Sequence, residues 1–196
     1  MLSSNATSSN ISWLAFAVGA VTLLGLALLI LMYVLKSGPL GMLNDICNGL
    51  GAALSVALAA ALFSQHQARS PQLAVPTLIL VVVGAIIAIA GSVLVISGAT
   101  GFFLAGMYTM LGYALIGIWV LSLNHSAPWP ASLTVLGLVA GGAMVLGLAT
   151  IPSIFMRIDS FQAAAWHTWL GQVGFLGWAI LYPIWCLRLW QVLRTG

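Results

Sequence analysis

The chain has 196 residues, of which 62% are hydrophobic and only 4% are charged, and its formal net charge is +3. Soluble domains carry roughly 25% charged residues, so a chain of this composition must have lipid as its main solvent. Its five basic residues are too few for the clustered positive face of a nucleic-acid-binding protein, so we expect a lipid bilayer and no nucleic acid as partner.

Six apolar segments reach or approach the roughly 20 residues that a helix needs to cross the hydrocarbon core. Short loops containing Gly, Pro, Asn or Ser separate them, as turns require. The predicted spans are residues 11–35, 46–63, 73–96, 102–123, 131–151 and 166–187. We therefore expect an all-α integral membrane protein, with residues 1–196 forming one domain of about six transmembrane helices. The second span is short, and a re-entrant segment there is an alternative that would reverse the sidedness of everything after it.

Orientation follows from the number of spans and from the basic residues. Six spans place both termini on one side, together with Arg69, Arg188 and Arg194, whereas Lys36 and Arg157 lie on the other side. Because cytoplasmic loops are enriched in basic residues, this distribution predicts that both termini are cytoplasmic.

Small residues recur along several predicted spans, often at a spacing of four. Small side chains let helix backbones approach closely, which stabilises helix pairs in lipid. They can pack the helices of this chain together or dock onto another membrane protein, and the sequence leaves both open. The helix-packing candidates are Gly49, Ala53, Ala57, Gly84, Gly137, Gly141 and Gly174.

A polar cluster is predicted at one membrane face. Span parity places Lys36, Asp45, Arg157, Asp159 and His167 on the same side, and both acidic residues of the chain are among them. A salt-bridged rim is the first interpretation, with Asp159 ionised and paired with Arg157 or Lys36. The segment 152–165 is then expected to lie in the interface as a short amphipathic helix, with Phe155 and Ile158 on its lipid-facing side.

The same cluster leaves an enzyme as an alternative. A carboxylate, an imidazole and a guanidinium can perform acid–base chemistry, so a membrane enzyme using Asp45, Asp159 and His167 is a third hypothesis. No nucleophile and no set of metal ligands accompanies these residues, and we therefore expect a protein that is not an enzyme and has no metal site.

The three histidines fall at span ends or in loops, away from the depth at which a transmembrane bis-histidine haem would lie. We therefore expect no cofactor. His66 and His125 share a side, which leaves a pigment or haem near that interface as an alternative, and His167 is the remaining histidine candidate. Trp178 is the one tryptophan clearly in the middle of a span, where its indole N–H needs a partner or must face a cavity.

A carrier or channel for a neutral or apolar solute is the second functional hypothesis. No predicted span has an ionisable residue in its middle, whereas coupled transporters place such residues at membrane depth. The polar candidates that remain are Thr22, Ser55, Tyr108, Thr109, Tyr113 and Gln172.

The second half of the chain, from Gly101 onward, carries a resemblance. The segments "YALIGIWVLSLN", "WPASLTVLGLVAGGAMVLG" and "GWAILYPIWCLRLWQVL" resemble bacterial multi-pass membrane proteins known only as a domain of unknown function. The resemblance implies a protein of the bacterial inner (cytoplasmic) membrane and supplies no activity and no catalytic residues. The sequence shows no catalytic set, no charge in the middle of a span and no soluble domain, while small residues recur along its spans and tryptophans gather near span ends. The first functional hypothesis is therefore a non-enzymatic accessory or structural subunit that packs against other membrane-protein subunits of a larger membrane complex, such as a respiratory or photosynthetic one.

Overall fold

The computed structural model describes residues 2–126 and 128–195, and these contain helices and no strand. Within them, six helical segments are long and apolar enough to cross a membrane. The expected all-α bundle of six membrane-spanning helices is therefore confirmed. In chain order the elements are α1 (Leu2–Leu35), α2 (Gly38–Arg69), α3 (Pro71–Ile96), α4 (Phe102–Ser126), α5 (Ala131–Val145), the 3-10 helix η1 (Leu146–Thr150), α6 (Ile151–Phe155), the 3-10 turn η2 (Phe161–Ala163), α7 (Trp166–Leu176), the π-helical turn η3 (Gly177–Leu181) and α8 (Tyr182–Thr195).

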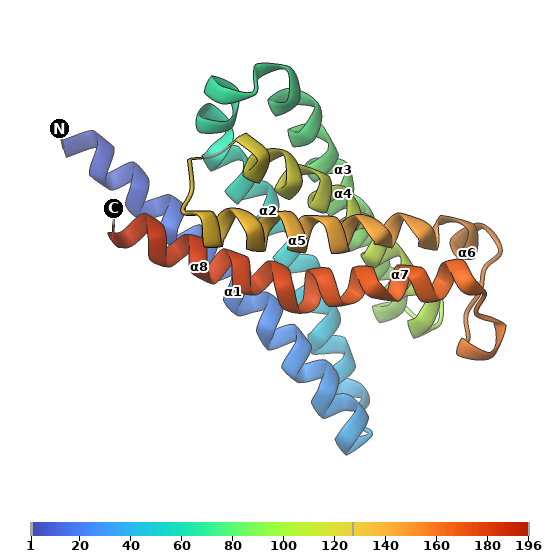
Figure 1. Ribbon diagram of the computed structural model, residues 1–196. Helices are drawn as coiled ribbons and strands as arrows, with labels where there is room; N and C mark the ends of the chain where they lie inside the picture. Colours follow the sequence, from blue (N-terminus) through green and yellow to red (C-terminus); the bar gives the residue numbers. More distant parts are fainter. Residues whose placement is uncertain (1, 127, 196) are drawn as a thin grey trace.

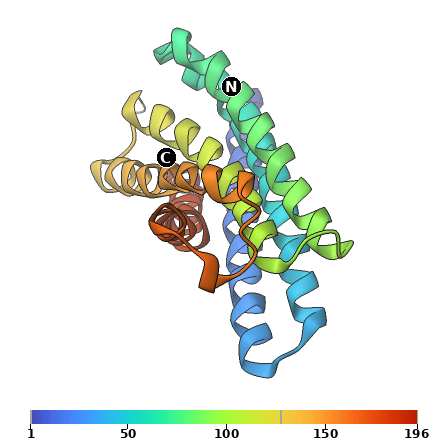
Figure 2. The ribbon, with the colours of Figure 1, turned by 90° about the vertical axis from the view of Figure 1, so that its right-hand side faces the viewer.

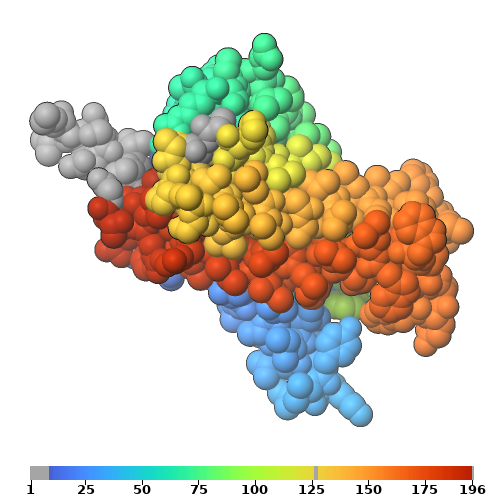
Figure 3. Space-filling view, viewed as in Figure 1, coloured from blue at the N-terminus to red at the C-terminus, as the bar shows by residue number. Residues whose placement is uncertain are grey.

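The helices form two groups that cross each other, α1 to α4 in one and α5 to α8 in the other (Figure 1). Each of α1 to α4 packs against the next, α5 packs on α4, and α8 returns to lie along α1. In Figure 2, α7 and α8 are seen almost end-on while α1 to α4 run up the page, so the two groups are far from parallel. The tip of the α1–α2 hairpin consequently diverges from the α6–α7 end, and Figure 3 shows the hollow that this leaves between them.

The second span is longer than the sequence predicts, and it is one unbroken helix of 32 residues. It begins at Gly38, because Pro39 is tolerated in a first turn, where its missing N–H would have no helical partner. At about 1.5 Å per residue this helix is about 48 Å long, more than a hydrocarbon core requires. Asp45 therefore lies two turns inside α2, whereas the predicted span begins only at residue 46 and leaves Asp45 in the preceding loop.

The segment between the fifth and sixth spans is a compact loop, and the expected interfacial amphipathic helix is wrong. The fifth span continues to Phe155, and Arg157 then turns the chain with a left-handed backbone (φ 51°). The Ile158 N–H closes this helix end by donating to the Ser153 carbonyl at 3.0 Å, as in a Schellman motif. Ile158 is 8% exposed as a result, so it faces the protein and not lipid.

Several predicted packing glycines make close contacts within the chain. A Cβ at Gly84 would meet the Gly112 carbonyl on α4, and one at Gly141 would lie 2.8 Å from the Gly117 carbonyl oxygen. Only glycine permits such approaches, so α3 and α5 each press directly on the α4 backbone. The other predicted packing glycines whose Cβ positions are taken by neighbours are Gly137, which meets Asn124, and Gly174, which meets Gly147.

The small residues predicted on α2 pack less closely. A Cβ at Gly49 would be at an ordinary contact distance, 3.6 Å, from the Ser92 hydroxyl oxygen of α3. Ala57 is half-buried and Ala53 is exposed. This stripe therefore runs from a helix contact toward the surface of the bundle.

Candidate functional site

A cavity of about 470 Å³ lies between α1, α2, α4 and α7, within the range of roughly 300–1,000 Å³ typical of small-molecule sites. It occupies the hollow between the α1–α2 hairpin and the start of α7 (Figure 3). Its wall is formed by Leu26, Leu29, Ile30, Tyr33, Asn44, Asp45, Asn48, Phe102, Phe103, Gly106, Thr109, Met110, Phe161, Gln172, Phe175 and Trp178.

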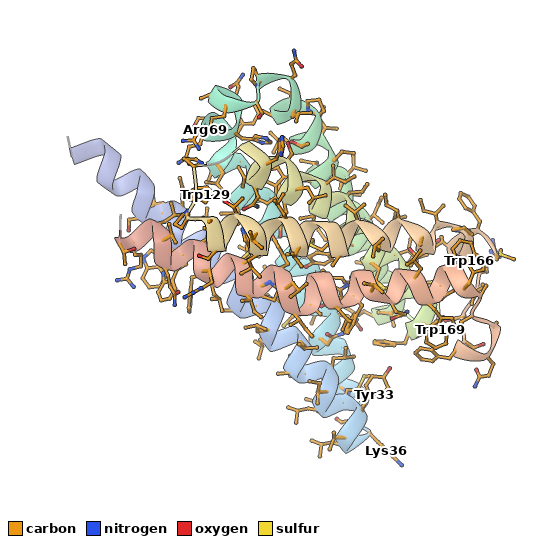
Figure 4. The ribbon with its side chains drawn as sticks, viewed as in Figure 1. Tyr33, Lys36, Arg69, Trp129, Trp166 and Trp169 are labelled. Carbon is orange, nitrogen blue, oxygen red and sulfur yellow. The ribbon has the colours of Figure 1, made fainter. Side chains whose placement is uncertain are left out.

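We call the end of the cavity that is lined by the exposed side chains of Tyr33, Phe102 and Phe161 its mouth. Figure 4 shows Tyr33 and Lys36 at the tip of the α1–α2 hairpin, with Trp169 across the hollow from them. Arg69 and Trp129 lie together at the opposite end. The mouth is therefore at the end of the molecule that carries Lys36.

The polar part of the wall comes from one face of α2. Asn44, Asp45 and Asn48 are all buried, and the four-residue spacing of the two asparagines places them one above the other. The Asn44 side-chain amide donates to Oδ1 of Asp45 at 3.2 Å. The second carboxylate oxygen, Oδ2, has no hydrogen bond to any described residue, and it is not fully enclosed, so it keeps accessible surface. Asp45 thus presents a free acceptor at the cavity wall.

Two further polar atoms are buried in this wall without a partner, the Oδ1 of Asn48 and the indole Nε1 of Trp178. The Trp178 ring stacks on Tyr113, with centroids 4.7 Å apart, and Tyr113 donates its hydroxyl to the Asn48 carbonyl at 2.9 Å. Buried polar atoms without partners are rare, and they mark places where a water or ligand completes the bonding. The Trp178 ring lines the cavity, but its Nε1 has no accessible surface and no partner among the described residues, so the expectation for the indole N–H is not met.

Trp178 owes its position to the π-helical turn of the sixth span. The Tyr182 N–H donates to the Gly177 carbonyl, five residues back, so this turn holds one residue more than an α-helical turn. Gly177 packs on α5 while Trp178 reaches the cavity and Ala179 is also buried, so three consecutive residues of one helix face the protein.

Apart from Tyr33, Thr109 and Gln172, the rest of the wall is apolar and largely aromatic. Phe102 and Phe103 come from the first turn of α4, Phe161 from η2 and Phe175 from α7. The rings of Phe103 and Phe161 lie 4.4 Å apart, which joins the loop to α4 at the mouth. The cavity therefore has a polar side on α2 and ring faces opposite.

Beyond the cavity floor the helices are tied together by hydrogen bonds between buried side chains. The Tyr182 hydroxyl donates to Oγ of Ser55 at 2.9 Å, and the Trp185 indole donates to Oδ1 of Asn124 at 3.1 Å. All four residues are at most 1% exposed. The far end is thus closed by packed, hydrogen-bonded side chains from α2, α4 and α8.

No family model, no curated protein and no solved structure matches this chain. Its function is therefore inferred from the chemistry of its own residues.

The structure does not join the five residues of the predicted polar cluster. Among the described side chains, no hydrogen bond or ion pair links any two of Lys36, Asp45, Arg157, Asp159 and His167. Lys36 and Arg157 are exposed, and both have a left-handed backbone at a helix end. Of the five, only Asp45 lines the cavity.

Asp159 caps a helix, and its expected pairing with Arg157 or Lys36 is wrong. Its Oδ2 accepts from the Gly101 N–H at 2.8 Å and its Oδ1 accepts from the Leu104 N–H at 2.9 Å, at the start of α4. The first N–H groups of a helix lack helical partners and carry partial positive charge, so a carboxylate satisfies both needs at once. Asp159 therefore ties the loop to α4 beside the mouth.

His167 is part of a buried hydroxyl cluster. Its Nδ1 lies 2.9 Å from Oγ of Ser153, which is 2.8 Å from Oγ1 of Thr168. Ser153 is 0% exposed, so this serine–histidine pair has no access to a substrate and serves to join α6 to α7. His66 bonds to Ser122 at 3.0 Å, and none of the histidines lines the cavity.

Sequence reasoning found parts of this site. Thr109 and Gln172, which it names as polar candidates, line the cavity, and Ser55 and Tyr113 contribute to the hydrogen bonds around its floor. It missed the cavity-lining role of Asn44, Asp45 and Asn48. The signal was Pro39, which marks the true start of α2 and brings all three into the helix.

Proposed function

We propose that this protein is a carrier for a small organic solute, which binds in the cavity beside Asp45. The observation that carries the proposal is a buried carboxylate inside a candidate membrane-spanning helix, on the wall of a cavity whose lining side chains are exposed at one end and whose other end is closed by packed side chains. An ionisable side chain at membrane depth is costly and typically marks a solute or ion pathway. Because the carboxylate is on the wall, the solute carries a polar group. A wholly apolar solute, which the sequence left open, does not fit this wall.

The accessory-subunit hypothesis loses one of its supports. Most of the packing glycines that suggested a partner make close contacts inside this chain. That hypothesis stays a prediction, whereas the cavity favours the carrier.

We further propose a bacterial cytoplasmic membrane as the location, with both termini cytoplasmic, on the basis of the resemblance and the basic residues. The cavity mouth beside Lys36 would then open to the periplasm. Reporter fusions at Ser37 and Gln67 test this arrangement, because they lie at opposite ends of α2. A cytoplasmic signal at Ser37 with a periplasmic one at Gln67 would reverse the orientation.

Alternating access is the property that separates a carrier from a fixed pocket. In a variant lacking Cys47 and Cys186, we would introduce Gly106→Cys, because Gly106 lines the cavity and a side chain there meets nothing within 4 Å. Gly142→Cys is the matched control, since Gly142 also has open space but does not line the cavity. Both variants would be reconstituted in oriented vesicles and exposed to a membrane-impermeant thiol reagent.

A carrier predicts that the cysteine at position 106 is modified from either face, because the site opens alternately to each, while the cysteine at position 142 is protected from both. Modification at 106 from the Lys36 face alone, under every condition tried, would contradict the carrier and indicate a fixed binding pocket. Equal modification at 106 and 142 would contradict the cavity itself.

A further inference from the structure

We propose that the solute is a protonated primary or secondary amine with an apolar, aromatic-sized body. This inference takes the cavity of the proposed function as its site and adds the chemical class of the ligand.

The sign of the charge follows from the wall. Asp45 is the only charged residue among the described side chains that line the cavity, and Tyr33 is the only other titratable one. No ion pair compensates Asp45, and its one hydrogen bond comes from the neutral amide of Asn44. A buried carboxylate is costly unless a cation or a proton compensates it. A cationic ligand is therefore stabilised in this cavity, whereas an anion finds no basic residue.

The form of the cation follows from the acceptors. Oδ2 of Asp45 has no donor among the described residues and keeps accessible surface, whereas Oδ1 of Asn48 is fully enclosed, so the carboxylate oxygen is the acceptor open to a ligand. An ammonium with N–H groups can donate to this oxygen, while a quaternary ammonium has no N–H to donate. Hydrogen bonds to a charged group are among the stronger ones in proteins, so the donor-bearing amine is favoured.

The body of the ligand follows from the opposite side. Phe102, Phe103, Phe161 and Phe175 supply ring faces and edges, and Leu26, Leu29 and Ile30 of α1 complete the apolar wall. Aromatic faces also attract cations. The combination of one carboxylate with many rings fits an aryl or cyclic alkyl amine better than a small hydrophilic cation.

Equilibrium dialysis of the full chain in nanodiscs tests the inference with three probes of similar shape, naphthylethylamine, naphthylethanol and the N-trimethylated amine. We expect the amine to bind at least about tenfold more tightly than the alcohol and more tightly than the trimethylated probe. Asp45→Asn should lower the affinity for the amine by at least about tenfold. Asp159→Asn is the control, because Asp159 is the other acidic residue and caps α4 outside the cavity wall.

Equal affinity for amine and alcohol, or an unchanged affinity in Asp45→Asn, would overturn the inference, and so would tighter binding of the trimethylated probe. A thermal unfolding curve for each variant separates loss of binding from loss of folding. The outcome is distinct from that of the accessibility experiment. Amine binding with access from one face only would leave the ligand class standing and refute the carrier, whereas alternating access without amine binding would do the reverse.

Discussion

The contact between α4 and α5 provides a matched pair of substitutions at adjacent positions, Gly141→Ala and Gly142→Ala. A Cβ at Gly141 would lie 2.8 Å from the Gly117 carbonyl oxygen and within 3.0 Å of two atoms of Leu121, whereas one at Gly142 would meet nothing within 4 Å. Ordinary contacts begin near 3.4 Å, so α5 would have to move away from backbone that cannot rotate aside. Overpacking of this kind costs about 1–3 kcal/mol.

Both variants also gain helix propensity, because Ala is better than Gly in a helix interior by about 1 kcal/mol. We therefore expect Gly142→Ala to be more stable than the parent by about 1 kcal/mol, and Gly141→Ala to be unchanged or less stable by up to about 2 kcal/mol. The difference between their free energies of unfolding measures the cost of overpacking, because both variants gain the same helix propensity. Unfolding of the purified protein with increasing sodium dodecyl sulfate in mixed micelles measures both free energies. If the two variants have the same free energy of unfolding, the close contact of α4 and α5 is refuted.

Four further substitutions, at three positions, test single features of the structure by the midpoint of thermal unfolding. Asp159→Ala removes both carboxylate oxygens that accept hydrogen bonds at the start of α4 and should lower the free energy of unfolding by about 1–2 kcal/mol. Asp159→Asn should lower it by about half as much, because one acceptor remains. An unchanged stability in both variants would refute the cap. Lys36→Gly should be neutral or stabilising by up to about 1 kcal/mol, since Lys36 has a φ of 50°, and clear destabilisation would contradict this backbone geometry. Tyr182→Phe should cost about 1 kcal/mol because Ser55 loses a donor but still donates to the Gly51 carbonyl; a stability equal to that of the parent would show that the Tyr182 bond contributes nothing.

The sequence predicts the spans because the length of each hydrophobic run can be read directly from the order of the residues. It misplaces the start of α2 since the polar run around Asp45 looks like a loop. Hydropathy cannot tell whether a polar residue lies outside the membrane or inside a helix facing a cavity. The distinction depends on whether neighbouring helices leave space there, and this is decided by how α1, α4 and α7 diverge.

The candidate site shows the same limit. The sequence brings Asp159 and Arg157 together because they are near neighbours with opposite charge. The structure separates them, because Arg157 turns the chain and the N–H groups of Gly101 and Leu104 satisfy the carboxylate. Sequence distance is a poor guide to pairing when a helix start 55 residues away along the chain offers two donors. The place of the Trp178 ring at the cavity agrees with the sequence, whereas its enclosed and unpartnered N–H does not.

The π-helical turn makes the sixth span sensitive to its length. Each residue of an α-helix advances the side chains by about 100° around the axis, so removing one residue from 177–181 would restore a regular helix and rotate everything after it by that amount. Tyr182 and Trp185 would then turn away from Ser55 and Asn124 together. Substitutions along this span act one position at a time, whereas an insertion or deletion there acts on the whole of α8. Related chains that keep this arrangement should therefore vary in residue type along the last helix while conserving the number of residues between Trp178 and Trp185.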